Sequence, residues 1–164
     1  MTELVRPFAV KRIGDSGAEF ALEANAAECA AIAARLLIPG VSSLQCRWRL
    51  HPAERGSIRA DGVLRASVTQ LCVVTVEPFP TEIVETFTVR FVLEDRLSEE
   101  GDDPEEPDEL IYDGVALDLG EAAVEQLALA LDPYPRAPGA VLPDLGEEDG
   151  GGAFAALAEL RKPN

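Results

Sequence analysis

The feature that most constrains the fold is the alternation of apolar and polar side chains between residues 57 and 93. Side chains of a β-strand point alternately to its two faces, so this pattern predicts strands with one buried face. Asp61 and Gly62 tolerate the positive φ values of a two-residue turn, and we expect a hairpin at this point. The strand that follows the turn is expected to reach Val76. The stretch therefore predicts a β-meander at the core.

A proline-rich segment interrupts this meander. Pro78 and Pro80 have no amide hydrogen to donate to a neighbouring strand, so we expect the ladder to break there and a second strand to begin at Glu82. A further strand is predicted over residues 44–51, which alternate without interruption and place Trp48 on the inward face.

Two helices are predicted from their capping signals. Asn25 and Asp118 can each accept hydrogen bonds from the first free amides of a helix, and a glutamate follows three positions later in both cases. Apolar residues at helical spacing follow each cap, and Pro39 and Pro133 are expected to end the helices. Together these elements predict an α+β domain with a mostly antiparallel sheet, two main helices and a long acidic loop. A barrel-like closure of the meander is one arrangement that the pattern allows.

The chain is expected to form a single domain over residues 1–135, followed by a flexible tail over residues 136–164. Within the domain, residues 95–108 are so rich in carboxylates that we expect a disordered loop. The tail is rich in proline, glycine and acidic residues, and it ends in a short amphipathic helix. The apolar face of that helix consists of Phe154, Leu157 and Leu160.

Charge is distributed unevenly along the chain. The formal net charge is −16, which argues against tight non-specific binding to a polyanion. The residues up to Arg65 nevertheless carry a net charge of +2, whereas those from Ala66 onward carry −18. The first part of the chain could therefore meet an anion that the rest would repel.

One basic cluster can be constructed from the predicted strands. Its candidate RNA-binding residues are Arg47, Arg49, Arg59 and Arg65. A guanidinium group pairs with phosphate through two hydrogen bonds, so such a surface suits RNA phosphates. The alternative interpretation is a solvated sheet face, and it is the one that we favour at this point. His51 has no second ligand or nucleophile nearby in sequence, and we expect it to be a surface residue.

The acidic loop and the C-terminal helix are candidate sites for a protein partner. The loop residues proposed for this role are Glu99, Glu100, Asp102, Asp103, Glu105 and Glu106, and the helix contributes its three apolar residues. A calcium loop is excluded because the fixed alternation of oxygen ligands, the central glycine and the closing glutamate are missing. A solvated loop without a partner and an arm that binds a basic protein both remain open.

The search for catalytic and metal-binding patterns leads to the expectation of a protein that is not an enzyme. The chain has one histidine and three widely spaced cysteines, so the common hydrolase triads, zinc sites and a disulfide framework are not available. Nucleotide-binding glycine loops are also missing. We expect no metal, cofactor or small-molecule substrate. The sequence shows no leader and no apolar run of about 20 residues, so we expect a cytoplasmic protein without a membrane partner.

Two stretches resemble the YceD family, the large ribosomal RNA subunit accumulation proteins. They are residues 62–78 and residues 118–127, the second lying ahead of Pro133. The residues of the first stretch that carry the resemblance are Gln70, Cys72, Thr75, Glu77 and Pro78. In many members this strand carries Cys-x-x-Cys, but Thr75 occupies the second cysteine position here. This departure removes the case for a metal, and Thr75 is expected to sit in a strand and serve packing.

The resemblance implies a bacterial cytoplasmic factor that supports the accumulation of large-subunit ribosomal RNA. Two mechanisms are compatible with it. In the first, the arginine cluster contacts large-subunit RNA. In the second, the acidic loop shields a basic ribosomal protein, and charge steering makes that encounter fast and sensitive to salt.

Overall fold

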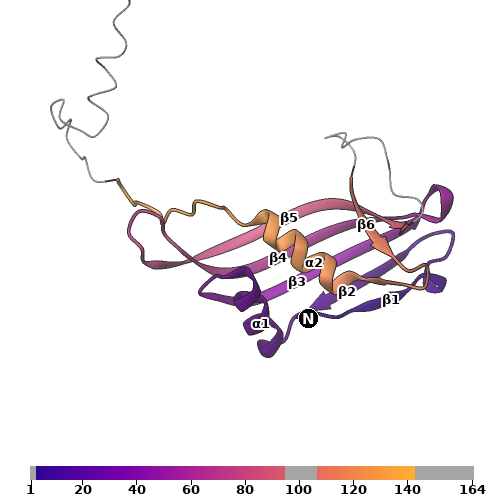
Figure 1. The fold of residues 1–164 in the computed structure, drawn as a ribbon, viewed down its shortest axis with the longest axis horizontal. Coiled ribbons are helices and arrows are strands. Elements are labelled where there is room, and N and C mark those ends of the chain that lie inside the picture. The colour runs from indigo at the N-terminus through magenta and orange to yellow at the C-terminus, as the bar shows by residue number, and fades with distance from the viewer. Residues whose placement is uncertain (1–2, 95–106, 143–164) are drawn as a thin grey trace, which may run out of the picture.

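The computed structural model describes residues 3–94 and 107–142, which form an α+β domain (Figure 1). This is the predicted fold class. The described elements, in chain order, are β1 (Pro7–Ala9), a 3₁₀ turn (Val10–Arg12), β2 (Ala18–Glu23), α1 (Ala26–Leu36), β3 (Gly40–Pro52), a second 3₁₀ turn (Glu54–Gly56), β4 (Ile58–Leu71), β5 (Pro78–Leu93), β6 (Asp108–Tyr112), β7 (Ala116–Asp118) and α2 (Leu119–Ala130).

The main sheet has five strands in the order β2-β3-β4-β5-β6. Neighbouring strands within this sheet are antiparallel, except that β5 and β6 are parallel. A separate two-stranded sheet pairs β1 with β7 in antiparallel register. Because β2 and β6 are the two edges of the main sheet, the described strands do not close into a barrel.

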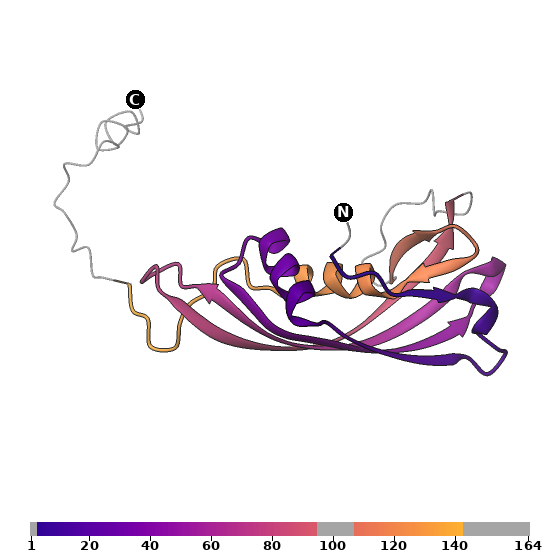
Figure 2. The same cartoon turned by 90° about the horizontal axis from the view of Figure 1, so that it is seen from below.

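The two α-helices of the described part of the chain, α1 and α2, lie on one side of the main sheet. Figure 2 shows α1, α2 and the β1–β7 pair stacked over one face, while no described element covers the opposite face. The core fills the space between these layers, with Trp48, Leu64 and Val89 from the sheet buried against Ile32 of α1 and Val124 of α2. We call the opposite side, formed by the outward residues of β2 to β5, the open face.

The predicted hairpin at Asp61 and Gly62 is wrong, because both residues lie inside β4. Gly62 pairs with Trp48 on one side and with Phe87 on the other. A Cβ atom on Gly62 would lie only 2.6 Å from Cε2 of Phe87, so the missing side chain makes room for the Phe87 ring to lie against Trp48. Glycine serves close packing at this position, not a turn.

The central strand ends earlier than predicted. β4 stops at Leu71, and residues 72–77 form a turn, in which Val76 has a φ of 58° and is 73% exposed. β5 then begins at Pro78, so the predicted break at the prolines is also wrong. β6 pairs only with Val89–Leu93, so the proline end of β5 has no neighbour on that side among the described strands. A strand tolerates proline at such an unpaired edge.

The predicted acidic loop overlaps with β6 at its last residue, because β6 begins at Asp108. Residues 95–106 and 143–164 lie outside the described part of the chain, and so do the candidate acidic residues and Phe154, Leu157 and Leu160. The predicted domain boundary at residue 135 therefore stays a prediction.

Candidate functional site

The alternation in β3 and β4 places the candidate arginines on the open face. In β3, Leu44, Cys46, Trp48 and Leu50 are buried and the residues between them are exposed. The register sets Arg47 opposite Val63, Arg49 opposite Asp61, and His51 opposite Arg59. Residues that are directly opposite in an antiparallel pair point to the same side. The four predicted arginines and His51 therefore share one surface.

Ion pairs divide these arginines into two groups. Arg49 Nε lies 3.1 Å from a carboxylate oxygen of Glu19, and an Arg59 nitrogen lies 3.1 Å from Asp61 Oδ1. Within residues 3–94 and 107–142, Arg47 and Arg65 have no carboxylate at ion-pair distance, and both side chains are exposed. The free positive charge of the predicted cluster is thus concentrated at Arg47 and Arg65.

The sequence analysis missed a fifth arginine on this surface. Arg90 of β5 lies opposite Arg59 in the register, and its guanidinium group bonds to a Glu109 carboxylate oxygen at 2.6 Å. Alternation alone shows that Arg90 points away from the core. Its neighbour across the sheet could not be known, because the misplaced hairpin gave the wrong partner for β4.

Asp61 is held in its charged form by its neighbours. Partial burial alone would raise the pKa of Asp61, but a 2.7 Å hydrogen bond from the Thr88 hydroxyl and the contacts with Arg59 outweigh it, so the pKa is lowered. The carboxylate of Asp61 therefore stays negatively charged at neutral pH, and it neutralises the positive charge of Arg59. This balance leaves Arg59 less suited than Arg47 or Arg65 to bind an added anion.

Of the family-motif residues, Cys72 and Thr75 lie in the turn over residues 72–77 at one end of the sheet and not in the strand that we predicted, while Gln70 lies in β4 and Pro78 begins β5. Gln70 is buried, and its side-chain amide donates to the carbonyl of Asp132 at 3.2 Å. The Val73 amide donates to the carbonyl of Pro135 at 2.8 Å. These two hydrogen bonds attach the segment that follows α2 to the end of β4 and to the turn. Glu77 and Pro78 complete the motif, and the carbonyl of Glu77 accepts from the Cys72 amide at 2.9 Å.

Thr75 serves hydrogen bonding within this turn and not strand packing. Its amide donates to Cys72 Sγ at 3.5 Å, and its hydroxyl oxygen accepts from the Glu77 amide at 3.4 Å. The Thr75 hydroxyl, followed by the amides of Ala137, Thr75 and Val74, lowers the pKa of the Cys72 thiol to about 7. Among the described residues, no group of three or more histidine, cysteine, aspartate or glutamate side chains could hold a metal ion.

The other two cysteines behave as small apolar residues. Cys29 and Cys46 are buried, and burial raises the pKa of both thiols, that of Cys46 to about 12. Neither forms a disulfide.

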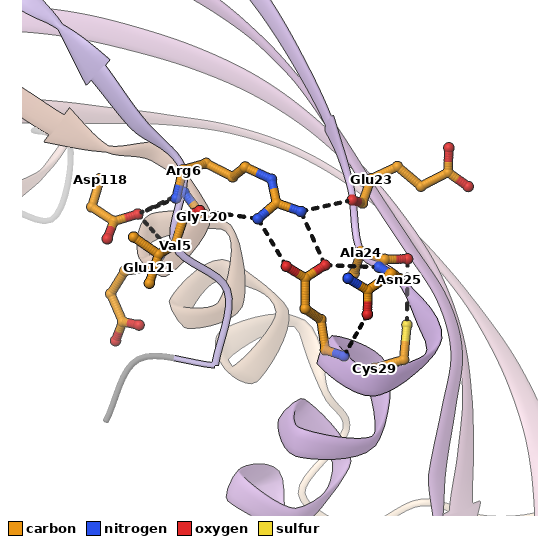
Figure 3. Close-up of polar contacts among 10 residues, drawn as sticks. Val5, Arg6, Glu23, Ala24, Asn25, Cys29, Asp118, Gly120 and Glu121 are labelled. Carbon is orange, nitrogen blue, oxygen red and sulfur yellow. Dashed lines mark hydrogen bonds and ion pairs between the residues drawn. The ribbon is translucent and has the colours of Figure 1, made fainter.

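A polar network on the covered side fixes the two helices and the N-terminal segment together (Figure 3). The Arg6 guanidinium bonds both carboxylate oxygens of Glu28 at 2.9 Å, and the Arg6 amide donates to Asp118 Oδ1 at 3.1 Å. Asn25 and Glu28 form the predicted capping box of α1, and Asp118 accepts from the first amides of α2 as predicted. Arg35 of α1 also bonds to Glu3 and Glu121. The network occupies the covered side and leaves the open face available.

A family model described as large ribosomal RNA subunit accumulation protein YceD matches residues 60–160. The chain belongs to the YceD family. The match begins at Ala60 within β4 and extends past α2, so it includes Arg65 and the turn at residues 72–77, whereas Arg47 of β3 lies before it. No curated protein and no solved structure matches the chain. Across the described residues, the helices are too short or too polar to span a membrane.

Proposed function

We propose that this YceD-family chain supports the accumulation of large-subunit ribosomal RNA by binding RNA through its open face, without catalysing a reaction. The family description supports the ribosomal role. The observation that supports this binding site is a pair of exposed arginines, Arg47 and Arg65, that form no ion pair with residues 3–94 and 107–142 and lie on a sheet face that no described element covers. Guanidinium groups in this state are available to phosphate without breaking an existing ion pair. We further propose that the protein acts in the bacterial cytoplasm.

Net charge favours a second candidate function. The chain carries −16 overall, so the acidic segments, including residues 99–106, could shield a basic ribosomal protein. In that mechanism the protein would not touch RNA, and the arginines of the open face would be solvated surface residues.

One experiment separates the two functions. The tagged full chain is purified from bacterial cells at low salt, and the bound material is divided into RNA and protein fractions. RNA binding predicts that precursor large-subunit RNA is recovered after removal of other proteins, and that the variant Arg47→Glu/Arg65→Glu loses it. Charge reversal at both positions should reduce RNA recovery by about tenfold or more, because each lost phosphate contact weakens binding in a salt-dependent way.

The matched control is Lys11→Glu/Arg136→Glu, which changes the net charge by the same amount at exposed positions outside the open face. Shielding predicts instead that a basic ribosomal protein stays bound after nuclease treatment, is released at high salt, and is lost when residues 99–106 are deleted. Recovery of that protein without RNA would refute the first function.

A further inference from the structure

We infer that the open face binds the sugar–phosphate backbone of double-helical RNA in preference to single-stranded RNA. This inference rests on the proposed function and narrows it to one form of RNA.

The open face lacks the tryptophan, tyrosine and phenylalanine side chains on which the bases of single-stranded RNA stack. The tryptophan and phenylalanine residues of β3 to β5 belong to the covered side: Trp48, Phe87 and Phe91 are in or against the core, and Phe79 lies opposite the buried Gln70. Sheets that bind single strands use exposed aromatic side chains as platforms for unstacked bases. Among the outward residues of β3, β4 and β5, the imidazole of His51 is the one aromatic ring, and it lies four residues along β3 from Arg47.

The open face does present charged groups at a spacing that suits a backbone. Arg47 lies opposite Val63, and Arg65 is two residues further along β4, so the two arginines are diagonal neighbours. Diagonal positions of this kind are roughly 7–8 Å apart. Two guanidinium groups at this separation can bind phosphates of the same stretch of backbone, and neither is held by a carboxylate within the described residues.

Neutral hydrogen-bonding groups lie beside these arginines. Gln45 is opposite Arg65, and Thr86 is opposite Val63. Both side chains are exposed and make no hydrogen bond with the described part of the chain. The wide, shallow minor groove of A-form RNA displays 2′-hydroxyl groups, which can donate to and accept from amide and hydroxyl side chains. The combination of cations and neutral polar groups therefore matches the minor-groove edge of an RNA duplex.

Acidic residues limit this surface to a small contact area. Across the strands, Glu23 of β2 pairs with Gln45, and Gln45 in turn pairs with Arg65. Two residues further along β4, Ser67 pairs with Glu82 of β5. The two glutamates repel phosphates that approach outside the arginine pair. We therefore expect binding that is weak, sensitive to salt and dependent on the shape of the duplex, and not general adhesion to polyanions.

The test measures the affinity of the full chain for three probes by fluorescence anisotropy at low salt. The probes are an RNA duplex of about 16 base pairs, one of its strands alone, and a DNA duplex of the same sequence. We expect the single strand to bind about tenfold more weakly than the RNA duplex, since its phosphates are less densely spaced and no tryptophan, tyrosine or phenylalanine of the open face can compensate by stacking, a contribution of about that size per base. The DNA duplex should also bind more weakly, because it lacks the 2′-hydroxyl groups.

The variants locate the binding site. Arg47→Glu/Arg65→Glu should lose duplex binding. Arg47→Gln/Arg65→Gln should keep part of it, with the slope of log affinity against log salt reduced by about 2, one for each phosphate contact. Lys11→Glu/Arg136→Glu should bind like the unmodified chain. Circular dichroism of each variant checks that it is folded.

Each other outcome has a distinct meaning. A single strand that binds as tightly as the duplex would overturn the inference and leave the proposed RNA function standing. If none of the three probes binds to the chain, both the proposed RNA function and this inference are refuted. Equal losses in the open-face and control variants would show that the binding does not occur at the open face.

Discussion

Gly62 shows how one missing side chain arranges the centre of the sheet. The ring of Phe87 lies across the glycine and meets Trp48 with ring centroids 5.1 Å apart, in an edge-to-face geometry. Edge-to-face aromatic pairs are favoured over face-to-face stacks. The glycine thus determines where the largest side chain of the core can sit.

A substitution at this position tests the arrangement. Gly62→Ala should lower the free energy of unfolding by about 2 kcal/mol, since the added methyl group overlaps the Phe87 ring in a close-packed core. Urea denaturation measures the change. Phe87→Leu provides the matched comparison, because it should cost less in the Gly62→Ala background than in the unmodified chain. Equal costs in both backgrounds would mean that the two residues do not interact as described.

The sequence correctly predicted the exposed positions of residues 44–51 and the first residues of the two helices, because both depend on residues of the same element. The alternation of Leu44 to His51 determined which side chains are exposed, and the capping residues Asn25 and Asp118 begin their helices as expected. The hairpin prediction failed because Asp61 and Gly62 favour a turn locally, while the contact with Phe87 depends on a strand that is distant in sequence. The ion pair of Arg49 with Glu19 could not be predicted for the same reason, since it depends on the register of β2 with β3. The ion pair of Arg59 with Asp61 joins residues two apart in β4, and it was not predicted because Asp61 was assigned to a turn.

At the scale of elements, α1 is joined to the N-terminal segment by the ion pair of Arg6 and Glu28. The contact with Arg6, followed by the hydrogen bond from the Asn25 amide, lowers the pKa of Glu28. Because this pKa is lower in the folded chain than in the unfolded chain, the ion pair stabilises the fold at neutral pH. That contribution is lost as the pH falls through the lowered pKa.

The variant Arg6→Met should therefore be less stable than the unmodified chain by about 1 kcal/mol at pH 7, and the difference should shrink as the pH falls to about 3. Urea denaturation across this pH range measures it. Arg12→Met is the control, because the Arg12 guanidinium lies over the Phe8 ring, 4.7 Å from its centroid, and the cost of losing it should vary less with pH. A difference for Arg6→Met that stays constant with pH would contradict the assigned role of Glu28.

At the scale of the whole molecule, stability and binding should respond to salt in opposite directions. A chain with a net charge of −16 repels itself when compact, and added ions screen this repulsion. We expect the free energy of unfolding to rise when sodium chloride increases from about 0.02 M to about 0.5 M, whereas RNA affinity falls over the same range. Urea midpoints in sodium chloride and potassium chloride at equal ionic strength should agree. A decrease in stability would show that screening of the ion pairs outweighs the relief of repulsion.

The pairing of β1 with β7 has a consequence for synthesis of the chain on the ribosome. The Arg6 amide bonds to Asp118, 112 residues later, and Leu4 lies against Gly120, where a Cβ atom would meet the Leu4 carbonyl. The N-terminal segment leaves the ribosome first, yet its partners are among the last elements of the domain to emerge. Contacts between such distant parts of a chain form slowly. The pairing of Phe8 with Leu117 and the contact of Leu4 with Gly120 can therefore form only after β7 and α2 have been made.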